Sequence, residues 1–329
     1  MIALPRRGVW LFPSAPAHAL VEAAVTAEQR GLDEFWLGDE GPARDPFAVL
    51  AAAAVRTSRI RLGVAVTNPY LRHPVALAAH AMTIDELSGG RFVLGLGPGG
   101  NVALGPANVP RTRPLATVRE ALHTVRAVTA GRAEAGYAPP AGAFTRPRVR
   151  IVIGSRSRGF QELASREADG VFLGGVPEPL IGQTVAWARS VRPIEVALYG
   201  TAALGDTVTE EVRPQLVMPL ADSPPHVHEA LGLDPVRLRA AANALAAGDA
   251  GPARRLVSDD VLSAMVLHGS PREIGRRLRG WLTHRSDSIG LSITADDPVQ
   301  AVADAAQALA TLSATSTAAD GVANPEVAR

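Results

Sequence analysis

The chain has 329 residues, 33 basic and 32 acidic side chains, a formal net charge of +1 and 47% hydrophobic residues, which is typical of a globular protein. Every basic side chain other than histidine is an arginine, so the chain contains no lysine, and it also contains no cysteine. The missing lysine excludes Schiff-base and pyridoxal-phosphate enzymes and the Walker-A phosphate loop. The missing cysteine excludes thiol nucleophiles, disulfides, iron–sulfur sites and cysteine-ligated zinc.

Short apolar runs that are typical of strands alternate along the chain with longer helical stretches. The predicted strands cover residues 9–12, 35–37, 60–66, 92–96, 150–153, 170–173, 195–199 and 289–294. The predicted helices cover residues 17–30, 46–56, 74–89, 114–130, 160–167 and 180–190, a long alanine-rich region up to about 267, and 270–282. Strict alternation demands a parallel sheet, and eight such units predict an α/β fold, a parallel eight-stranded (β/α)8 TIM barrel with insertions. A doubly wound sheet is the main alternative.

One barrel accounts for residues 1–312 as a single domain. Residues 313–329 are small, polar and without a pattern, so we expect a flexible C-terminal tail. The N-terminal residues lack the order of a secretory signal, so we expect a cytoplasmic protein.

The composition also restricts the partners of the chain. Balanced charge and only 4% aromatic residues argue against a nucleic-acid surface. The longest uncharged stretch, residues 92–110, holds too many glycines and prolines for a membrane-spanning helix. The eight histidines show no His-x-x-x-His spacing, so we expect no metal site. We expect a small-molecule substrate and a homodimer.

Glycine-rich and polar clusters follow the predicted strands that end near residues 37, 66, 96 and 153. In a barrel of this kind the chemistry lies at the C-terminal ends of the strands. One cluster, Gly95-x-Gly97-x-x-Gly100, matches the dinucleotide fingerprint, which needs a helix directly after the glycines. Pro98, Pro106 and Pro110 make that helix implausible, so we reject a Rossmann site.

Several segments of the chain carry a resemblance to a known family. They are GLDEFWLGDE at 31–40, TSRIRLG at 57–63, VTNP at 66–69 with RHP at 72–74, and DELSGGRFVLGLG at 85–97. The chain resembles the luciferase-like monooxygenase superfamily, in particular its coenzyme F420-dependent oxidoreductases such as methylenetetrahydromethanopterin reductase. The resemblance spans roughly residues 8–312. It implies an oxidoreductase that transfers a hydride between the deazaflavin F420 and a small organic substrate, acting as a reductase with reduced F420.

The resemblance also implies residues that bind the cofactor. In the family the third strand ends in a bulge with a non-prolyl cis peptide against the deazaflavin ring, and this bond falls at Ala65-Val66. The small residues Gly63 and Ala65 fit a close approach of the ring, although an ordinary buried strand is the alternative. The other expected cofactor-binding residues are Thr67 and Asn68 at the pyrimidine edge, Gly97, Pro98 and Gly99 beside the ring, Gly154, Ser155 and Arg156 at the phosphate, and Gly174 and Gly175. Turn formation before Pro69 is the alternative for Thr67 and Asn68.

Asp39 and Glu40 are the expected catalytic residues. Asp39 would bind and orient the cofactor, and Glu40 would be the pocket acid that protonates the substrate. The equally weighted alternative is that Asp39 caps the following loop and Glu40 pairs with Arg44. Many relatives carry an acid at the position of Gly100, so the proton donor of this chain is open.

Two other functions remain open at this point. An FMN-dependent monooxygenase would use the same barrel with reduced flavin and O₂. A barrel that has lost catalysis and only binds a cofactor or a partner is the second alternative, since glycine stands at the acid position.

Overall fold

Eight parallel strands of the chain close into a barrel in the computed structural model, which describes residues 4–39, 43–100, 104–134, 136–140, 149–204 and 208–313. The strands found within these ranges are β1 (Arg6–Leu11), β2 (Glu34–Leu37), β3 (Arg61–Thr67), β4 (Phe92–Leu96), β5 (Arg150–Gly154), β6 (Gly170–Gly174), β7 (Glu195–Leu204), β8 (Val266–Gly269) and β9 (Ser288–Ile293). Strands β1 to β7 pair in sequence order, and β9 pairs with both β7 and β1, which closes the ring. The predicted TIM barrel is confirmed.

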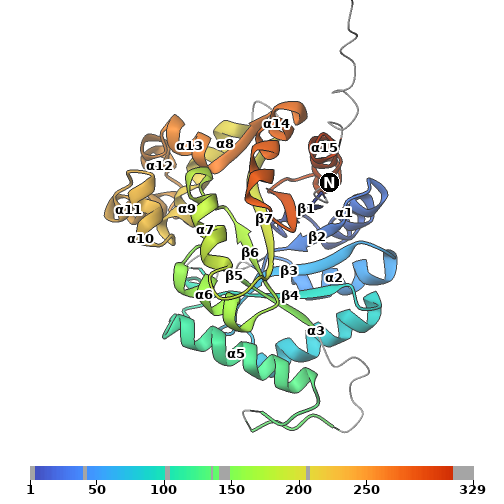
Figure 1. Cartoon of the computed structure of the whole chain (residues 1–329). Helices are drawn as coiled ribbons and strands as arrows, with labels where there is room; N and C mark the ends of the chain where they lie inside the picture. Colours follow the sequence, from blue (N-terminus) through green and yellow to red (C-terminus); the bar gives the residue numbers. More distant parts are fainter. Residues whose placement is uncertain are drawn as a thin grey trace, which may run out of the picture.

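Helices surround the barrel on its outside (Figure 1). Their bounds are α1 (Ala17–Gln29), α2 (Pro46–Arg56), α3 (Pro74–Ser88), α5 (Pro114–Thr129), α6 (Arg158–Glu167), α7 (Ile181–Ala188), α8 (Val208–Gln215), α9 (Val217–Ala221), α10 (Pro225–Ala230), α11 (Pro235–Ala246), α12 (Gly251–Leu256), α13 (Asp259–Met265), α14 (Pro271–Trp281) and α15 (Pro298–Ala310). Two short 3-10 helices cover Glu178–Leu180 and Leu282–His284.

Side chains cap the first turns of two helices. Asp45 precedes α2 and accepts a 2.9 Å hydrogen bond from the backbone N–H of Ala48. Ser270 and Glu273 form the complete capping box at the start of α14. Proline at the first position of α2 and α14 fixes the backbone without losing a helical hydrogen bond.

The segment between β7 and α14 differs from the predicted long helix. β7 runs on to Leu204, helices α8 to α13 follow, and the unpredicted strand β8 pairs with the outer half of β7. Pro214, Pro225 and Pro235 each interrupt or begin a helix, because proline removes a helical N–H and restricts the residue before it. Helices α9 to α13 gather beside the barrel (Figure 1) and share a hydrophobic core of their own that includes Leu216 and Leu238.

Aromatic side chains fill the barrel interior. Trp36 lies against Phe172 and Tyr199, with ring centroids 5.1 Å and 6.4 Å away. A Cβ on Gly63 would lie 2.2 Å from the Trp36 ring. Gly63 therefore makes room for Trp36, which explains its small size by packing inside the barrel, and the close approach of a cofactor stays a prediction.

Two predictions concern the chain as a whole. The division into one domain over residues 1–312 and a tail over 313–329 stays a prediction, and residues 314–329 lie outside the described ranges. None of the helices in the described part of the chain has both the length and the apolar character that a membrane crossing requires.

Candidate functional site

The predicted site residues come together at the C-terminal ends of the barrel strands. Asp39 follows β2, Thr67 ends β3, Gly97 follows β4, and Gly154 and Gly174 end β5 and β6. Since parallel strands of a barrel end at the same rim, these residues of five strands share one face. Glu40, the other predicted catalytic residue, lies outside the described residues.

A polar network joins the ends of β2 and β3. The hydroxyl of Thr67 donates a 2.6 Å hydrogen bond to Asp39 Oδ2. The guanidinium of Arg72 donates two hydrogen bonds to the same carboxylate, from Nε to Oδ2 at 2.9 Å and from an Nη to Oδ1 at 3.3 Å. Arg72 also pairs with Asp45 at 2.9 Å and lies over the Phe47 ring at 5.0 Å. Asp39 is therefore held in one orientation by three donated hydrogen bonds, and its side chain keeps only 10% of its surface exposed.

Asn68 forms the turn that was considered for it and keeps one polar atom without a partner among the described residues. Its Oδ1 accepts hydrogen bonds from the backbone N–H groups of Tyr70 at 3.2 Å and Leu71 at 3.0 Å, as the turn interpretation requires. Its Nδ2 is buried and has no hydrogen-bond partner among the described residues. A Cβ added at Gly99 would lie 3.2 Å from Asn68 Cγ, so this amide lies directly beside the loop after β4. A buried donor without a partner is costly, which favours an acceptor supplied by a ligand.

The bulge predicted at the end of β3 is present. The bond between Ala65 and Val66 is a cis peptide, and the register between β3 and β4 shifts between Val64 and Thr67. The indole Nε1 of Trp10 donates a hydrogen bond to the carbonyl oxygen of Ala65. Trp10 is half-buried at this place and so connects the end of β1 to the bulge.

The glycines of the rim accommodate a protein side chain. A Cβ at Gly97 would lie 2.5 Å from Val66 Cγ2, and one at Gly154 would lie 2.4 Å from Val66 Cγ1. A Cβ at Gly95 would likewise lie 3.3 Å from Val66 Cγ1. These glycines make room for Val66, which gives a packing reason for their small size, and a role of Gly97 and Gly154 in binding a cofactor stays a prediction. Pro98 remains half-buried at the rim.

The predicted phosphate residues lie before α6. The guanidinium of Arg156 donates to the carbonyl of Pro219 at 2.8 Å and to that of Gly175 at 3.5 Å, so it joins the loops after β5 and β6 to α9. Ser155 Oγ accepts a 3.2 Å hydrogen bond from the backbone N–H of Ser157, the N-cap residue of α6. The arginine and the start of a helix thus adjoin, as an anion site requires.

Two residues that the sequence did not single out complete this face. Arg111 donates a 2.8 Å hydrogen bond to the carbonyl of Gly99, and its other Nη lies 3.9 Å from Asp222 Oδ1. Asp222 Oδ2 lies 3.0 Å from the place of a Cβ on Gly100. Asp222 follows α9 in the segment between β7 and α14, where no motif points to a function, so only the tertiary contact with Gly100 reveals it.

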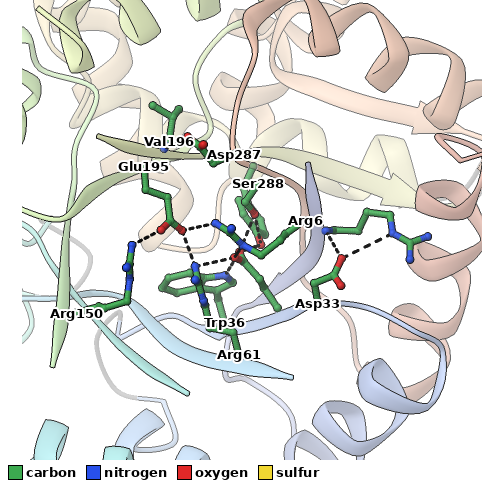
Figure 2. Close-up of polar contacts among 12 residues, drawn as sticks. Arg6, Asp33, Trp36, Arg61, Arg150, Glu195, Val196, Asp287 and Ser288 are labelled. Carbon is green, nitrogen blue, oxygen red and sulfur yellow. Dashed lines mark hydrogen bonds and ion pairs between the residues drawn. The ribbon is translucent and has the colours of Figure 1, made fainter. Parts of the chain in front are cut away.

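The opposite, N-terminal end of the barrel holds a different set of charges. Figure 2 shows Glu195 between Arg6, Arg61 and Arg150, each the first residue of its strand. The fully buried Glu34 accepts hydrogen bonds from Arg6 at 2.7 Å, Arg61 at 3.1 Å and three further donors, namely Trp36, Tyr199 and Ser288.

The electrostatics of this end indicate a structural role. Burial would raise the pKa of Glu34, but the guanidinium groups of Arg61 and Arg6 outweigh it, and the pKa is lowered. Burial and the neighbouring Glu34 raise the pKa of Tyr199 well above its ordinary value. Two clefts of about 340 Å³ open here, lined by Arg6 and Arg150 among others. The arginines and carboxylates of this network pair with one another, which is the arrangement of a stabilising cluster at the face of a barrel that carries no chemistry.

No three histidine, aspartate or glutamate side chains in the described ranges are grouped so that they could hold a metal ion.

Comparison with known proteins decides the family. The family model described as luciferase-like monooxygenase matches residues 1–286. The chain belongs to the luciferase-like monooxygenase family. It is 30% identical over 289 residues to the 5,10-methylenetetrahydromethanopterin reductase of Methanolobus tindarius, which covers 82% of this chain and 89% of that protein. The predicted resemblance and the predicted oxidoreductase class are confirmed.

Two solved structures share the fold. The coenzyme F420-dependent tetrahydromethanopterin reductase of Methanopyrus kandleri superposes with a TM-score of 0.79 at 24% identity, over 93% of this chain and 98% of that chain. A monooxygenase from Streptomyces bottropensis superposes with a TM-score of 0.67 at 21% identity, over 93% and 98% of the two chains. A reductase and a monooxygenase therefore both have the barrel described above.

Proposed function

We propose that this luciferase-like family member transfers a hydride between coenzyme F420 and a small organic substrate, acting as a reductase with reduced F420. The observation that carries the proposal is the buried Nδ2 of Asn68, a donor with no partner in the described part of the chain, at the end of β3. The reductase named among the relatives matches most of both chains, which favours reductase chemistry over oxygenation.

The residues of the rim fit this cofactor. Asn68 Nδ2 would donate to a carbonyl oxygen of the pyrimidine edge of the ring, which removes the cost of a buried donor without a partner. Arg156 and the start of α6 would bind a phosphate. When bound, F420 supplies the hydride from C5 of its reduced ring.

Asp39 would act here as an orienting residue. Its carboxylate accepts hydrogen bonds from Thr67 and Arg72. Because the Thr67 hydroxyl hydrogen points to Asp39, the Thr67 oxygen would act toward the ring edge as a hydrogen-bond acceptor. We keep Glu40 as a proposed pocket acid. Ala65, Val66, Gly97, Pro98, Gly99, Gly154, Ser155, Gly174 and Gly175 complete the proposed cofactor-binding set.

Titration of the full chain with oxidised F420 and with FMN tests the proposal, because Trp10 at the rim can report binding through fluorescence quenching. We expect saturable quenching by F420. Tight binding of FMN without binding of F420 would favour the monooxygenase alternative, and binding of neither would favour a barrel that has lost catalysis.

The Asn68→Asp variant sharpens this test. Aspartate keeps the acceptor oxygen for Tyr70 and Leu71 and replaces the Nδ2 donor with a second, charged acceptor oxygen. The loss of one hydrogen bond to a buried carbonyl, together with the new negative charge, is expected to weaken F420 binding at least tenfold, in line with about 1.5 kcal/mol. Equal affinity of the variant and the wild type for F420 would remove Asn68 from the site.

The sequence also predicts a homodimer, a cytoplasmic location and a small-molecule substrate. Light scattering of the purified chain measures the first of these directly.

A further inference from the structure

The first residues of β1, β3, β5 and β7 meet in one layer at the N-terminal end of the barrel. They are Arg6, Arg61, Arg150 and Glu195. Alternate strands of a TIM barrel contribute the four side chains of an interior layer, and branched apolar residues usually fill it. Here one glutamate accepts hydrogen bonds from three arginines (Figure 2). The layer therefore has more positive than negative charge.

One of the two clefts at this end opens beside the layer. It has a volume of about 340 Å³, and its wall contains the three arginines of the layer together with Arg59 and Arg91. Among the described residues, Asp33 is the single acid in this wall, and it lies 3.9 Å from Arg7, which is not part of the wall. Five arginines thus line a cleft whose one acid has a cation of its own.

Arg59 and Arg91 bring charge to the cleft without a carboxylate partner. The guanidinium of Arg91 donates to four backbone carbonyl groups and one threonine hydroxyl. Arg59 is exposed, and its guanidinium donates to the carbonyl of Glu28 at 3.3 Å. The Glu28 carboxylate accepts the backbone N–H groups of residues 58–60 instead. Neither guanidinium forms an ion pair within the described part of the chain.

The surroundings of this cleft hold two more positive charges than negative ones. The five arginines of the wall stand against three carboxylates, those of Glu28, Glu34 and Glu195, while Asp33 and Arg7 form a pair of their own. Arginine is always charged at neutral pH. A phosphate group on a small molecule carries a charge of about −1.5 to −2 at pH 7, which matches the surplus.

The arginines of the layer also keep hydrogen-bond donors for such a ligand. Arg61 uses one Nη for both Glu34 and Glu195, so its Nε and its other Nη have no partner among the described residues. Arg150 likewise uses one Nη, for Glu195. The Arg61 and Arg150 side chains keep 22% and 46% of their surface exposed, so a ligand can reach them. A planar guanidinium donates two parallel N–H groups to two phosphate oxygens.

The other cleft at this end provides a contrast. It has the same volume of about 340 Å³. Its wall contains as many acids as arginines, namely Asp169, Glu195 and Asp287 with Arg6, Arg150 and Arg192. Three carboxylates in the wall would repel an anion, so the charge of the wall and not the size of the cleft distinguishes the two.

We propose that the cleft lined by Arg59, Arg61 and Arg150 binds a phosphate group, either as free phosphate or as the phosphate monoester of a small molecule. The cleft lies at the N-terminal end of the barrel, opposite the rim of the proposed cofactor site, and the inference does not depend on the proposed function. Since the ligand would bind the folded chain alone, it would stabilise the fold.

Calorimetric titration of the full chain with inorganic phosphate tests the proposal, at an ionic strength held constant with chloride. Saturable binding of phosphate is expected. Glycerol 3-phosphate is the second ligand and distinguishes the two sources. Tighter binding of glycerol 3-phosphate than of phosphate identifies a monoester as the ligand, and tighter binding of phosphate identifies the free anion. Saturable binding of neither ligand overturns the inference.

Two variants locate the binding at the cleft. Arg59→Gln removes one charge from the wall, and because Arg59 is exposed and its guanidinium makes one backbone hydrogen bond, the variant is expected to fold as the wild type does. Its affinity for phosphate is expected to fall about fivefold, and that of Arg150→Gln about tenfold, the loss of one charge-assisted hydrogen bond. Arg192→Gln is the matched control from the other cleft and is expected to bind within twofold of the wild type. Wild-type affinity in both Arg59→Gln and Arg150→Gln overturns the inference.

The test must also separate this cleft from the proposed cofactor site, where Arg156 and the start of α6 would bind a phosphate. Arg156→Gln is expected to retain the phosphate binding that Arg59→Gln weakens, and saturating F420 is expected not to displace it. Loss of all phosphate binding in Arg156→Gln would assign the binding to the rim and overturn the inference. A wild type that binds phosphate but not F420 would overturn the proposed function and leave this inference intact.

Discussion

The hydroxyl of Thr67, the last residue of β3, donates a 2.6 Å hydrogen bond to the carboxylate of Asp39, two residues past β2. This bond connects the two neighbouring strands at the rim where the proposed cofactor site lies. Both side chains are largely removed from water, so the bond is stronger than an exposed one. The orientation of Asp39 therefore depends on a residue of the next strand.

Removal of the Thr67 hydroxyl is expected to weaken cofactor binding. In Thr67→Val the shape of the side chain remains but Asp39 loses one donor, and F420 affinity, measured by fluorescence titration, is expected to fall about tenfold. Thr67→Ser keeps the hydroxyl and serves as the control. Equal affinity of the valine variant and the wild type would show that the Asp39–Thr67 bond has no part in the site.

The contact between Gly154 and Val66 predicts a coupled pair of substitutions. Gly154→Ala places a methyl group 2.4 Å from Val66 Cγ1, and such overpacking is expected to cost about 1–3 kcal/mol of unfolding free energy. In a Val66→Ala background the same substitution is expected to cost less, because the two side chains no longer compete for one space. Denaturant titration of the four proteins gives the coupling energy. Additive effects would contradict the packing described for Val66.

Two glycines of α14 give opposite expectations. A Cβ at Gly275 would lie 1.8 Å from Thr311 Oγ1 and 2.8 Å from the carbonyl oxygen of Ala308, so Gly275→Ala is expected to destabilise the chain by about 1–3 kcal/mol. Gly280 has no atom within 4 Å of its Cβ position, so Gly280→Ala on the same helix is expected to stabilise by a few tenths to about 1 kcal/mol. Thermal unfolding of both variants tests the close packing of α14 on α15. A stabilising Gly275→Ala would disprove it.

The buried Glu34 predicts how stability depends on pH. Burial raises the pKa of Glu34, but Arg61 and Arg6 lower it by more than burial raises it. The folded chain therefore binds the carboxyl proton less readily than the unfolded chain does. The stabilisation from Glu34 is therefore complete above the ordinary glutamate pKa and is lost as the pH falls from that value through the lower pKa of the folded state.

Glu34→Gln removes this dependence. At neutral pH the variant is expected to be less stable by about 3 kcal/mol, because two half-buried guanidinium groups lose a fully buried charged partner, and the difference from the wild type shrinks in acid. Glu22→Gln is the control, since Glu22 and Arg56 form an exposed pair at 3.0 Å that contributes less than about 1 kcal/mol. Unfolding free energies measured across the acid range test both statements. A constant difference between Glu34→Gln and the wild type would contradict the lowered pKa.

Local sequence patterns predicted the elements that hold the fold together. The strand at 92–96 and the helix that starts at Pro46 after Asp45 agree with the structure at their ends, because apolar runs, proline and capping side chains act within one turn or one strand. Alternation of strands with helices then leads to a parallel barrel, since the connections allow few other topologies. The family resemblance also placed the bulge at Ala65 and Val66.

The sequence by itself thus determined the barrel, the exclusion of lysine and cysteine chemistry, and the rim at which polar residues gather. Only the tertiary structure decided what these residues touch. Gly63 and Gly154 have Trp36 and Val66 in the space beside them, and Asp222 lies close to Gly100 although the two are 122 positions apart in the chain. The physical reason is that composition and periodicity act over a few residues, whereas packing and proton transfer depend on distances between strands and helices that are brought together only when the barrel closes.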